Sequence, residues 1–117
     1  MNPITYTVNR AEVLQFSDDL DAGNISTVKT LFNQYAEAES DVIIDLTNVH
    51  FMDSSGVGAI VFLYKRLIRK GCNVIIIGLH GQPEQLFKML QLNRNLSCYV
   101  TMSDYLADVQ AQPEWIR

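Results

Sequence analysis

Two short and almost purely apolar runs constrain the fold of this chain most. They are Val42-Ile43-Ile44-Asp45-Leu46 and Val74-Ile75-Ile76-Ile77, and a stretch with helical periodicity lies between them. Runs of this kind are typical of strands buried on both faces, as in a parallel sheet covered by helices. Parallel neighbours need a crossover connection, and the intervening helix supplies one. We therefore expect an α/β protein.

The other elements are read from periodicity and from turn residues. Strands over residues 4–8 and 13–16 are expected to form a hairpin that turns at Asn9 and Arg10, with the first strand half-buried. Further elements are expected as a helix from residue 25, a helix over 56–70 ended by Gly71, a helix starting near Pro83, an edge strand over 97–100 and a final helix capped by Ser103. The order β-β-α-β-α-β-α-β-α predicts a central mixed, mostly parallel sheet with helices packed on it.

Apolar residues at helical spacing predict which side chains of the helices face inward. They are Ile25, Val28, Leu31, Phe32 and Tyr35 in the first helix, Val57, Ile60, Val61, Tyr64, Leu67 and Ile68 in the second, Leu86, Phe87, Met89 and Leu90 in the third, and Leu106 and Val109 in the last. Asn24 and Ser26 are both candidates for the cap of the first helix.

Length and composition indicate one domain. A chain of 117 residues with 48% apolar and 19% charged residues lies in the ordinary globular range. We expect residues 1–117 to form a single domain, with a core over about 4–109 and a tail over 110–117. The tail holds the only tryptophan, Trp115, which docks either on the domain or on a partner.

Charge is distributed unevenly along the chain. Residues 1–54 hold nine acidic and two basic residues, a net charge of −7, and residues 55–117 carry +3. The overall charge of −4 argues against direct binding of nucleic acid, which needs a basic face. The acidic half is either scattered solvated charge or an acidic surface for a basic partner.

The two cysteines and the first residues of the chain indicate the cellular compartment of the protein. Cys72 and Cys98 show no metal-ligand spacing and are expected to be buried free thiols of a cytosolic protein. The first residues lack a signal-peptide pattern, and no apolar run approaches the roughly 20 residues that span a bilayer. We expect a cytoplasmic protein without membrane insertion.

The segment Phe51-Met52-Asp53-Ser54-Ser55-Gly56-Val57-Gly58 joins a buried strand to a helix. Free N–H groups and the positive end of the dipole favour an oxygen anion at such a helix start. Capping alone would explain one of its three polar residues. Two glycines in the first turn each cost about 1 kcal/mol relative to alanine. Without side chains they would let another molecule approach the backbone closely.

Enzymatic motifs are missing from this segment. It has no Gly-Lys-Ser/Thr ending of a P-loop, and Ser54 is not flanked as in the nucleophile elbow of hydrolases. His50 or His80 could act as a base only if the fold brought one of them to Ser54. We therefore expect no catalytic residue, no cofactor and no metal site.

The stretch from Asp45 to Gly58, read Asp-Leu-Thr-Asn-Val-His-Phe-Met-Asp-Ser-Ser-Gly-Val-Gly, resembles the signature of STAS domains, nearest to the bacterial anti-sigma factor antagonists. The resemblance covers about residues 4–109. It includes Asp18-Asp19-Leu20-Asp21, similar to the family's Gly-Glu-Leu-Asp segment, and residues 86–92, similar to its third helix. Asp18 and Gln91 stand where the family usually has glycine.

The resemblance implies a partner switch. In the family, the unphosphorylated antagonist binds an anti-sigma factor that is also a serine kinase, and so releases a sigma factor. The kinase phosphorylates the serine that corresponds to Ser54, and a serine phosphatase restores the binding form. The positions implied in partner binding are Asp21, Asp53, Ser54, Ser55, Gly56 and Gly58.

Two other functions stay open at this point. The chain could be a constitutive STAS subunit bound to the ATPase of a lipid-transport ABC system. It could also be an enzyme or a nucleotide-binding protein. The only support for this alternative is the helix start, which favours an anion. The sequence does not indicate the oligomeric state.

Overall fold

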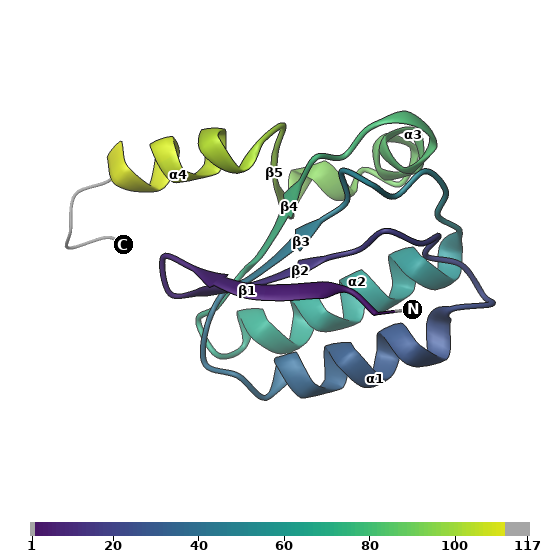
Figure 1. Cartoon of the computed structure of the whole chain (residues 1–117), viewed down its shortest axis with the longest axis horizontal. Coiled ribbons are helices and arrows are strands. Elements are labelled where there is room, and N and C mark those ends of the chain that lie inside the picture. The colour runs from purple at the N-terminus through teal and green to yellow at the C-terminus, as the bar shows by residue number, and fades with distance from the viewer. Residues whose placement is uncertain (1, 112–117) are drawn as a thin grey trace.

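A computed structural model describes residues 2–111 of the chain. Its sheet has five strands in the order β1-β2-β3-β4-β5, in which β1 is antiparallel to β2 and all other neighbours are parallel (Figure 1). The strands are β1 (Ile4–Val8), β2 (Ala11–Gln15), β3 (Val42–Asp45), β4 (Val74–Ile77) and β5 (Ser97–Tyr99). The predicted α/β fold with a mixed, mostly parallel sheet is confirmed.

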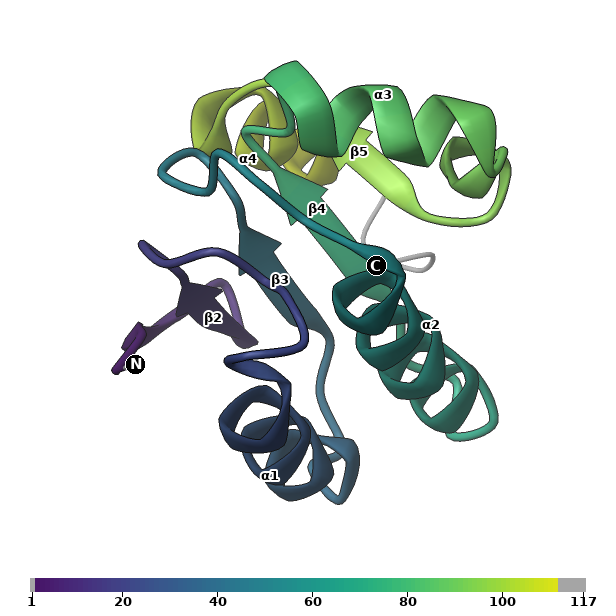
Figure 2. The same ribbon diagram turned by 90° about the vertical axis from the view of Figure 1, so that its right-hand side faces the viewer.

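The helices lie on both faces of this sheet. They are α1 (Ile25–Ala36), α2 (Ser54–Ile68), α3 (Gly81–Met89), the short 3-10 helix η1 (Leu92–Arg94) and α4 (Met102–Ala111). α1 and α2 run side by side along one face (Figure 2), and α4 packs on the other. In residues 2–111, no helix is both long and apolar enough to cross a membrane.

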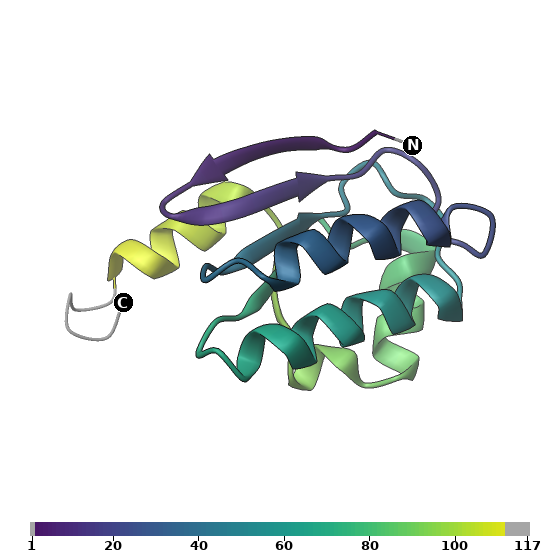
Figure 3. The ribbon, with the colours of Figure 1, turned by 90° about the horizontal axis from the view of Figure 1, so that it is seen from below.

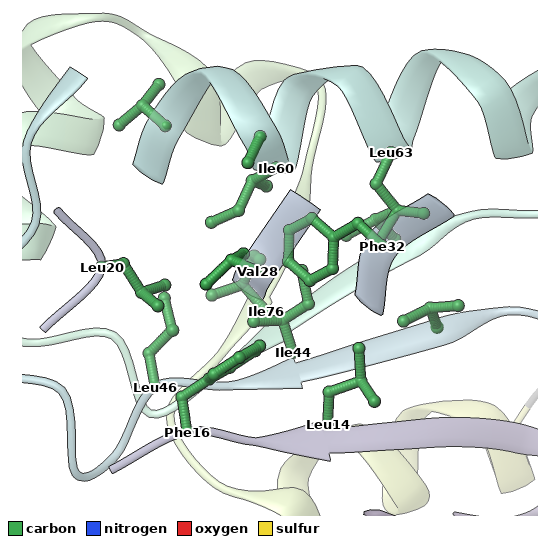
Figure 4. Close-up of a cluster of buried hydrophobic side chains, with 14 of the residues drawn as sticks. Leu14, Phe16, Leu20, Val28, Phe32, Ile44, Leu46, Ile60, Leu63 and Ile76 are labelled. Carbon is green, nitrogen blue, oxygen red and sulfur yellow. The ribbon is translucent and has the colours of Figure 1, made fainter. Parts of the chain in front are cut away.

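Alternation along the central strands divides the core into two layers. Leu14, Ile44 and Ile76 point toward α1 and α2, where the rings of Phe16 and Phe32 meet edge to face at 6.0 Å (Figure 4). The opposite layer is smaller and joins residues of β2, β3 and β4 to Tyr105 of α4. All residues of β3 and β4 are buried, as their unbroken apolar runs predict.

Several expected burials are wrong. β1 is exposed rather than half-buried, because it is the outermost strand and most of its length lies beyond the cover of the helices. Ile68, Met89 and Leu90 are exposed because they lie at the final turns of their helices. The cysteines are not buried either: Cys72 is partly exposed in the loop before β4, and Cys98 is exposed on the edge strand β5.

The predicted caps also need correction. Asn24 precedes α1 but its side chain makes no capping bond, and the carboxylate of Asp21 accepts the N–H groups there instead. Ser103 lies inside α4, and the Thr101 hydroxyl accepts the N–H of Asp104. β2 begins at Ala11 rather than at residue 13, so that Asn9 and Arg10 alone form the turn. Trp115 lies outside the described residues.

Candidate functional site

Ser54 is the first residue of α2 and is exposed to solvent. The residue before it, Asp53, caps the helix: its Oδ1 accepts the N–H groups of Ser55 at 2.9 Å and of Gly56 at 3.3 Å. Of the three polar residues at this helix start, Asp53 therefore takes the capping role. The Ser54 hydroxyl is left free of that role at the positive end of the helix dipole.

A second loop, between β2 and α1, is tied to this helix start. Leu20 donates to the carbonyl of Phe51 at 3.1 Å and accepts from the N–H of Asp53 at 3.2 Å. The other carboxylate oxygen of Asp53 accepts the N–H of Ala22 at 3.1 Å. These bonds join two segments that are more than thirty positions apart in the chain. The neighbouring Asp21 thus lies on the adjoining loop, although its own carboxylate binds the N–H groups of its loop.

The same bonds set the ionisation of Asp53. Desolvation acts to raise the pKa of its carboxyl, but the N–H groups of Ala22, Gly56 and Ser55 favour the ionised form. Together they hold the pKa of Asp53 below its ordinary value of 3.8. A full negative charge therefore stands beside Ser54 at neutral pH.

The two glycines near the start of α2 have different surroundings. A Cβ on Gly56 would lie 2.3 Å from the carbonyl oxygen of Leu20 and 2.9 Å from its Cβ. Gly56 is therefore required by packing between the two loops. A Cβ on Gly58 would meet no atom within 4 Å, and Gly58 is exposed. Only Gly58 keeps the feature that the sequence suggested for both, an open backbone that another molecule can approach.

A groove of 490 Å³ lies between α1 and α2, beside Ser54. Its floor and walls combine the apolar rings of Phe32 and Phe62 with the backbone of Gly58. Phe62 is 46% exposed although it is aromatic, and the guanidinium of Arg66 lies 5.5 Å from the centre of its ring. The groove is lined by Lys29, Phe32, Asn33, Ser54, Ser55, Gly58, Ala59 and Phe62.

The first turn of α3 supports the site from the other side. The side-chain amide of Gln82 accepts the N–H of Met52 at 2.9 Å and donates to its carbonyl at 2.8 Å. Sequence reasoning missed Gln82, because no pattern marks a side chain that binds backbone thirty positions away. The only indication in the sequence was its position near the start of the helix that follows the next strand.

The two histidines lie next to each other, and neither is arranged as a base for Ser54. The rings of His50 and His80 meet edge to face at 5.6 Å. The Nε2 of His80 is 2.8 Å from the carbonyl oxygen of Thr47. His80 therefore pairs with backbone and not with Ser54 in this arrangement.

The acidic residues of the first half divide into structural and surface groups. Asp45 is only 7% exposed and accepts bonds from the N–H and hydroxyl of Thr47. Asp41 accepts the N–H of Asn73 at 2.8 Å. Part of the −7 charge thus holds the fold together. Asp53 is adjacent to Ser54, and Asp21 lies on the loop that is tied to Asp53.

Comparisons with known proteins agree with the signature. The family model described as "STAS domain" matches residues 2–105. The anti-sigma-B factor antagonist of Listeria monocytogenes is 33% identical over 76 residues, which are 64% of this chain and 67% of that protein.

Solved structures share the fold at low identity. An anti-sigma-factor antagonist (STAS) domain protein from Planctomyces limnophilus is 16% identical, with a TM-score of 0.85 over 93% of this chain and 98% of that one. The Bacillus cell fate determinant SpoIIAA in its phosphorylated form is 18% identical, with a TM-score of 0.70 over 92% and 98% of the two chains. From the sequence match and the fold together, this chain belongs to the STAS domain family.

Proposed function

We propose that the chain is an anti-sigma factor antagonist switched by phosphorylation of Ser54. The unphosphorylated protein binds an anti-sigma factor that is also a serine kinase, and a sigma factor is released. The kinase modifies Ser54 and ends the binding, and a serine phosphatase restores it. The protein acts in the cytoplasm as one domain, through protein partners rather than through catalysis or direct contact with nucleic acid.

The observation that carries this proposal is the setting of Ser54. The residue is exposed at a helix start, its neighbour Asp53 provides the cap, and it borders the groove between α1 and α2. A kinase can therefore reach the hydroxyl without unfolding the helix. The Listeria relative named anti-sigma-B factor antagonist and the phosphorylated SpoIIAA structure support the same assignment.

The local charges explain how one phosphate would end binding. A phosphate adds about −1.5 to −2 charges and three acceptor oxygens. The helix dipole tolerates an anion at this end, so the fold should persist. The phosphate would stand beside the ionised Asp53, which has the same sign of charge, and at the edge of the groove. A partner surface fitted to a small hydroxyl would meet a larger and more negative group there. A loss of about 3 kcal/mol weakens binding more than a hundredfold.

The modification is tested with candidate anti-sigma kinases and ATP, followed by mapping of the modified residue by mass spectrometry. We expect one phosphate on Ser54 in the wild type and in Ser55→Ala, and none in Ser54→Ala. Ser55 is the matched control because it also lines the groove and follows directly in the same turn. Phosphate on another residue, with Ser54 unmodified by every candidate kinase, would contradict the proposal.

Binding to the partner is measured with two variants that add the same charge. Ser54→Asp should weaken binding, whereas Ser103→Asp, at an exposed position in the first turn of α4 on the opposite face of the sheet, should leave it unchanged. Equal binding by wild type and Ser54→Asp would instead favour a constitutive STAS subunit. Recovery of an ABC ATPase from a pull-down would then identify the lipid-transport alternative.

A further inference from the structure

Within β1 itself, the outer edge carries no charged side chain, no proline and no bulge, which are the features that usually protect a sheet edge. Within residues 2–111, β1 pairs only with β2, and Figure 3 shows it as the outermost strand of the sheet. Its sequence, Ile-Thr-Tyr-Thr-Val, has no charge, and all five of its residues pair with β2 without a bulge. Ile4 is 58% and Tyr6 40% exposed. Such an edge is a template for pairing with another strand.

The turn of the hairpin decides which backbone groups face outward. Asn9 and Arg10 both have positive φ, 50° and 69°, as a two-residue type I′ turn requires. Val8 and Ala11 are then a hydrogen-bonded pair, and such pairs alternate along the strand. The N–H and C=O groups of Thr5 and Thr7 are therefore directed away from β2, toward the open edge.

We propose that this edge binds β1 of a second copy of the chain, antiparallel, with the two-fold axis at Tyr6. In this register Thr5 of each copy exchanges both backbone hydrogen bonds with Thr7 of the other. Moving the axis toward the N-terminus would pair Thr7 with Pro3, which has no N–H. Moving it the other way would use Asn9, which is in the turn. Centring on Tyr6 is the register that uses the open edge fully.

Charge and side-chain pattern favour a second copy as the occupant. Residues 2–9 contain no charged side chain, although residues 1–54 carry a net charge of −7. A two-fold pairing of this stretch brings no charge against its own copy. Tyr6 faces Tyr6 of the second copy and Ile4 faces its Val8, on the sheet face that also holds Val13. No residue of β1 lines the groove at Ser54, so this surface is independent of the proposed switch.

Opposite charges introduced at Tyr6 test the proposed register of the β1–β1 pairing. By sedimentation of the full chain across a range of concentrations, we expect the wild type to dimerise. Tyr6→Lys and Tyr6→Glu should each raise the dissociation constant about tenfold or more, since like charges would lie directly opposite. An equal mixture of the two should recover the dimer. The matched pair Ile4→Lys and Ile4→Glu should show no recovery, because Ile4 does not face itself. A wild type that stays monomeric, or a mixture that fails to recover, overturns the proposal.

A cysteine trap gives a second, independent readout. In a chain carrying Cys72→Ser and Cys98→Ser, Tyr6→Cys should form a disulfide-linked dimer under mild oxidation. Opposed residues of a non-hydrogen-bonded pair have Cα atoms about 4.5 Å apart, within the range that a disulfide spans. Ile4→Cys is the control, since its two copies would be about 13 Å apart along the strands. Equal cross-linking of both variants, or of neither, would refute this register.

Discussion

The two glycines at the start of α2 give opposite predictions for the same substitution. Gly56 is the third and Gly58 the fifth residue of α2, and within a helix alanine is favoured over glycine by about 1 kcal/mol. At Gly58 the added methyl group meets no atom within 4 Å, so the whole helix-propensity gain should be realised. We expect Gly58→Ala to stabilise the fold by about 0.5–1 kcal/mol.

At Gly56 the same methyl group would lie 2.3 Å from the carbonyl oxygen of Leu20. That contact is with backbone, so the loop before α1 must move. Overpacking of this kind costs about 1–3 kcal/mol. Loss of the bond from the N–H of Asp53 to the Leu20 carbonyl costs about 1 kcal/mol more and offsets the helix gain. Gly56→Ala should therefore destabilise by about 1–3 kcal/mol.

Urea denaturation of both variants measures the two free energies of unfolding. The midpoint should rise for Gly58→Ala and fall for Gly56→Ala, and the two free energies of unfolding should differ by about 1.5–4 kcal/mol. Partner binding should behave differently: Gly58→Ala places a methyl group in the groove beside Ser54 and should weaken binding despite the gain in stability. A shift of the same sign in both variants would refute the packing argument. Unchanged binding by Gly58→Ala would refute the role of the groove.

Three further predictions follow from single contacts. Gln82→Ala should destabilise by about 2–4 kcal/mol in urea denaturation, because it leaves both backbone groups of the buried Met52 unpaired, while Gln85→Ala on the exposed side of α3 should change little. Gln91→Gly should stabilise by about 0.5–1 kcal/mol, because Gln91 has φ 57°; an unchanged midpoint would argue against strain there. The hydrogen bond to Asp108, with desolvation, raises the pKa of Tyr99 from 10.0 to about 12. Stability should therefore be full below pH 10 and decline between pH 10 and about 12, a decline that Tyr99→Phe should reduce in alkaline denaturation, with the remainder coming from Tyr105, whose pKa burial also raises.

The sequence predicted the central sheet well, because unbroken apolar runs report burial on both faces. β3 and β4 lie within the expected runs 42–46 and 74–77, and β3 ends at Asp45, one residue before the end of its run. The alternation of apolar and polar residues in β1 indicated that its two faces differ. It does not indicate whether another element covers either face. The exposure of Ile4 therefore followed from the number and reach of the helices, which no local pattern contains.

The candidate site was predicted in part. The position of Ser54 at a helix start follows from local residue types, but these left the cap open among Asp53, Ser54 and Ser55. The tie between Asp53 and Ala22, the support from Gln82 and the distinct role of Gly56 depend on contacts between segments about thirty positions apart or more. Such contacts are set by the tertiary fold, and single-sequence patterns do not contain them.

The central claim is that one phosphate on Ser54 controls partner binding. The most direct measurement is the dissociation constant of the anti-sigma factor for the unphosphorylated chain and for the chain stoichiometrically phosphorylated at Ser54, by calorimetry in the same buffer. We expect phosphorylation to weaken binding about a hundredfold or more, with the circular dichroism spectrum of the fold unchanged. Equal dissociation constants for the two forms would contradict the account.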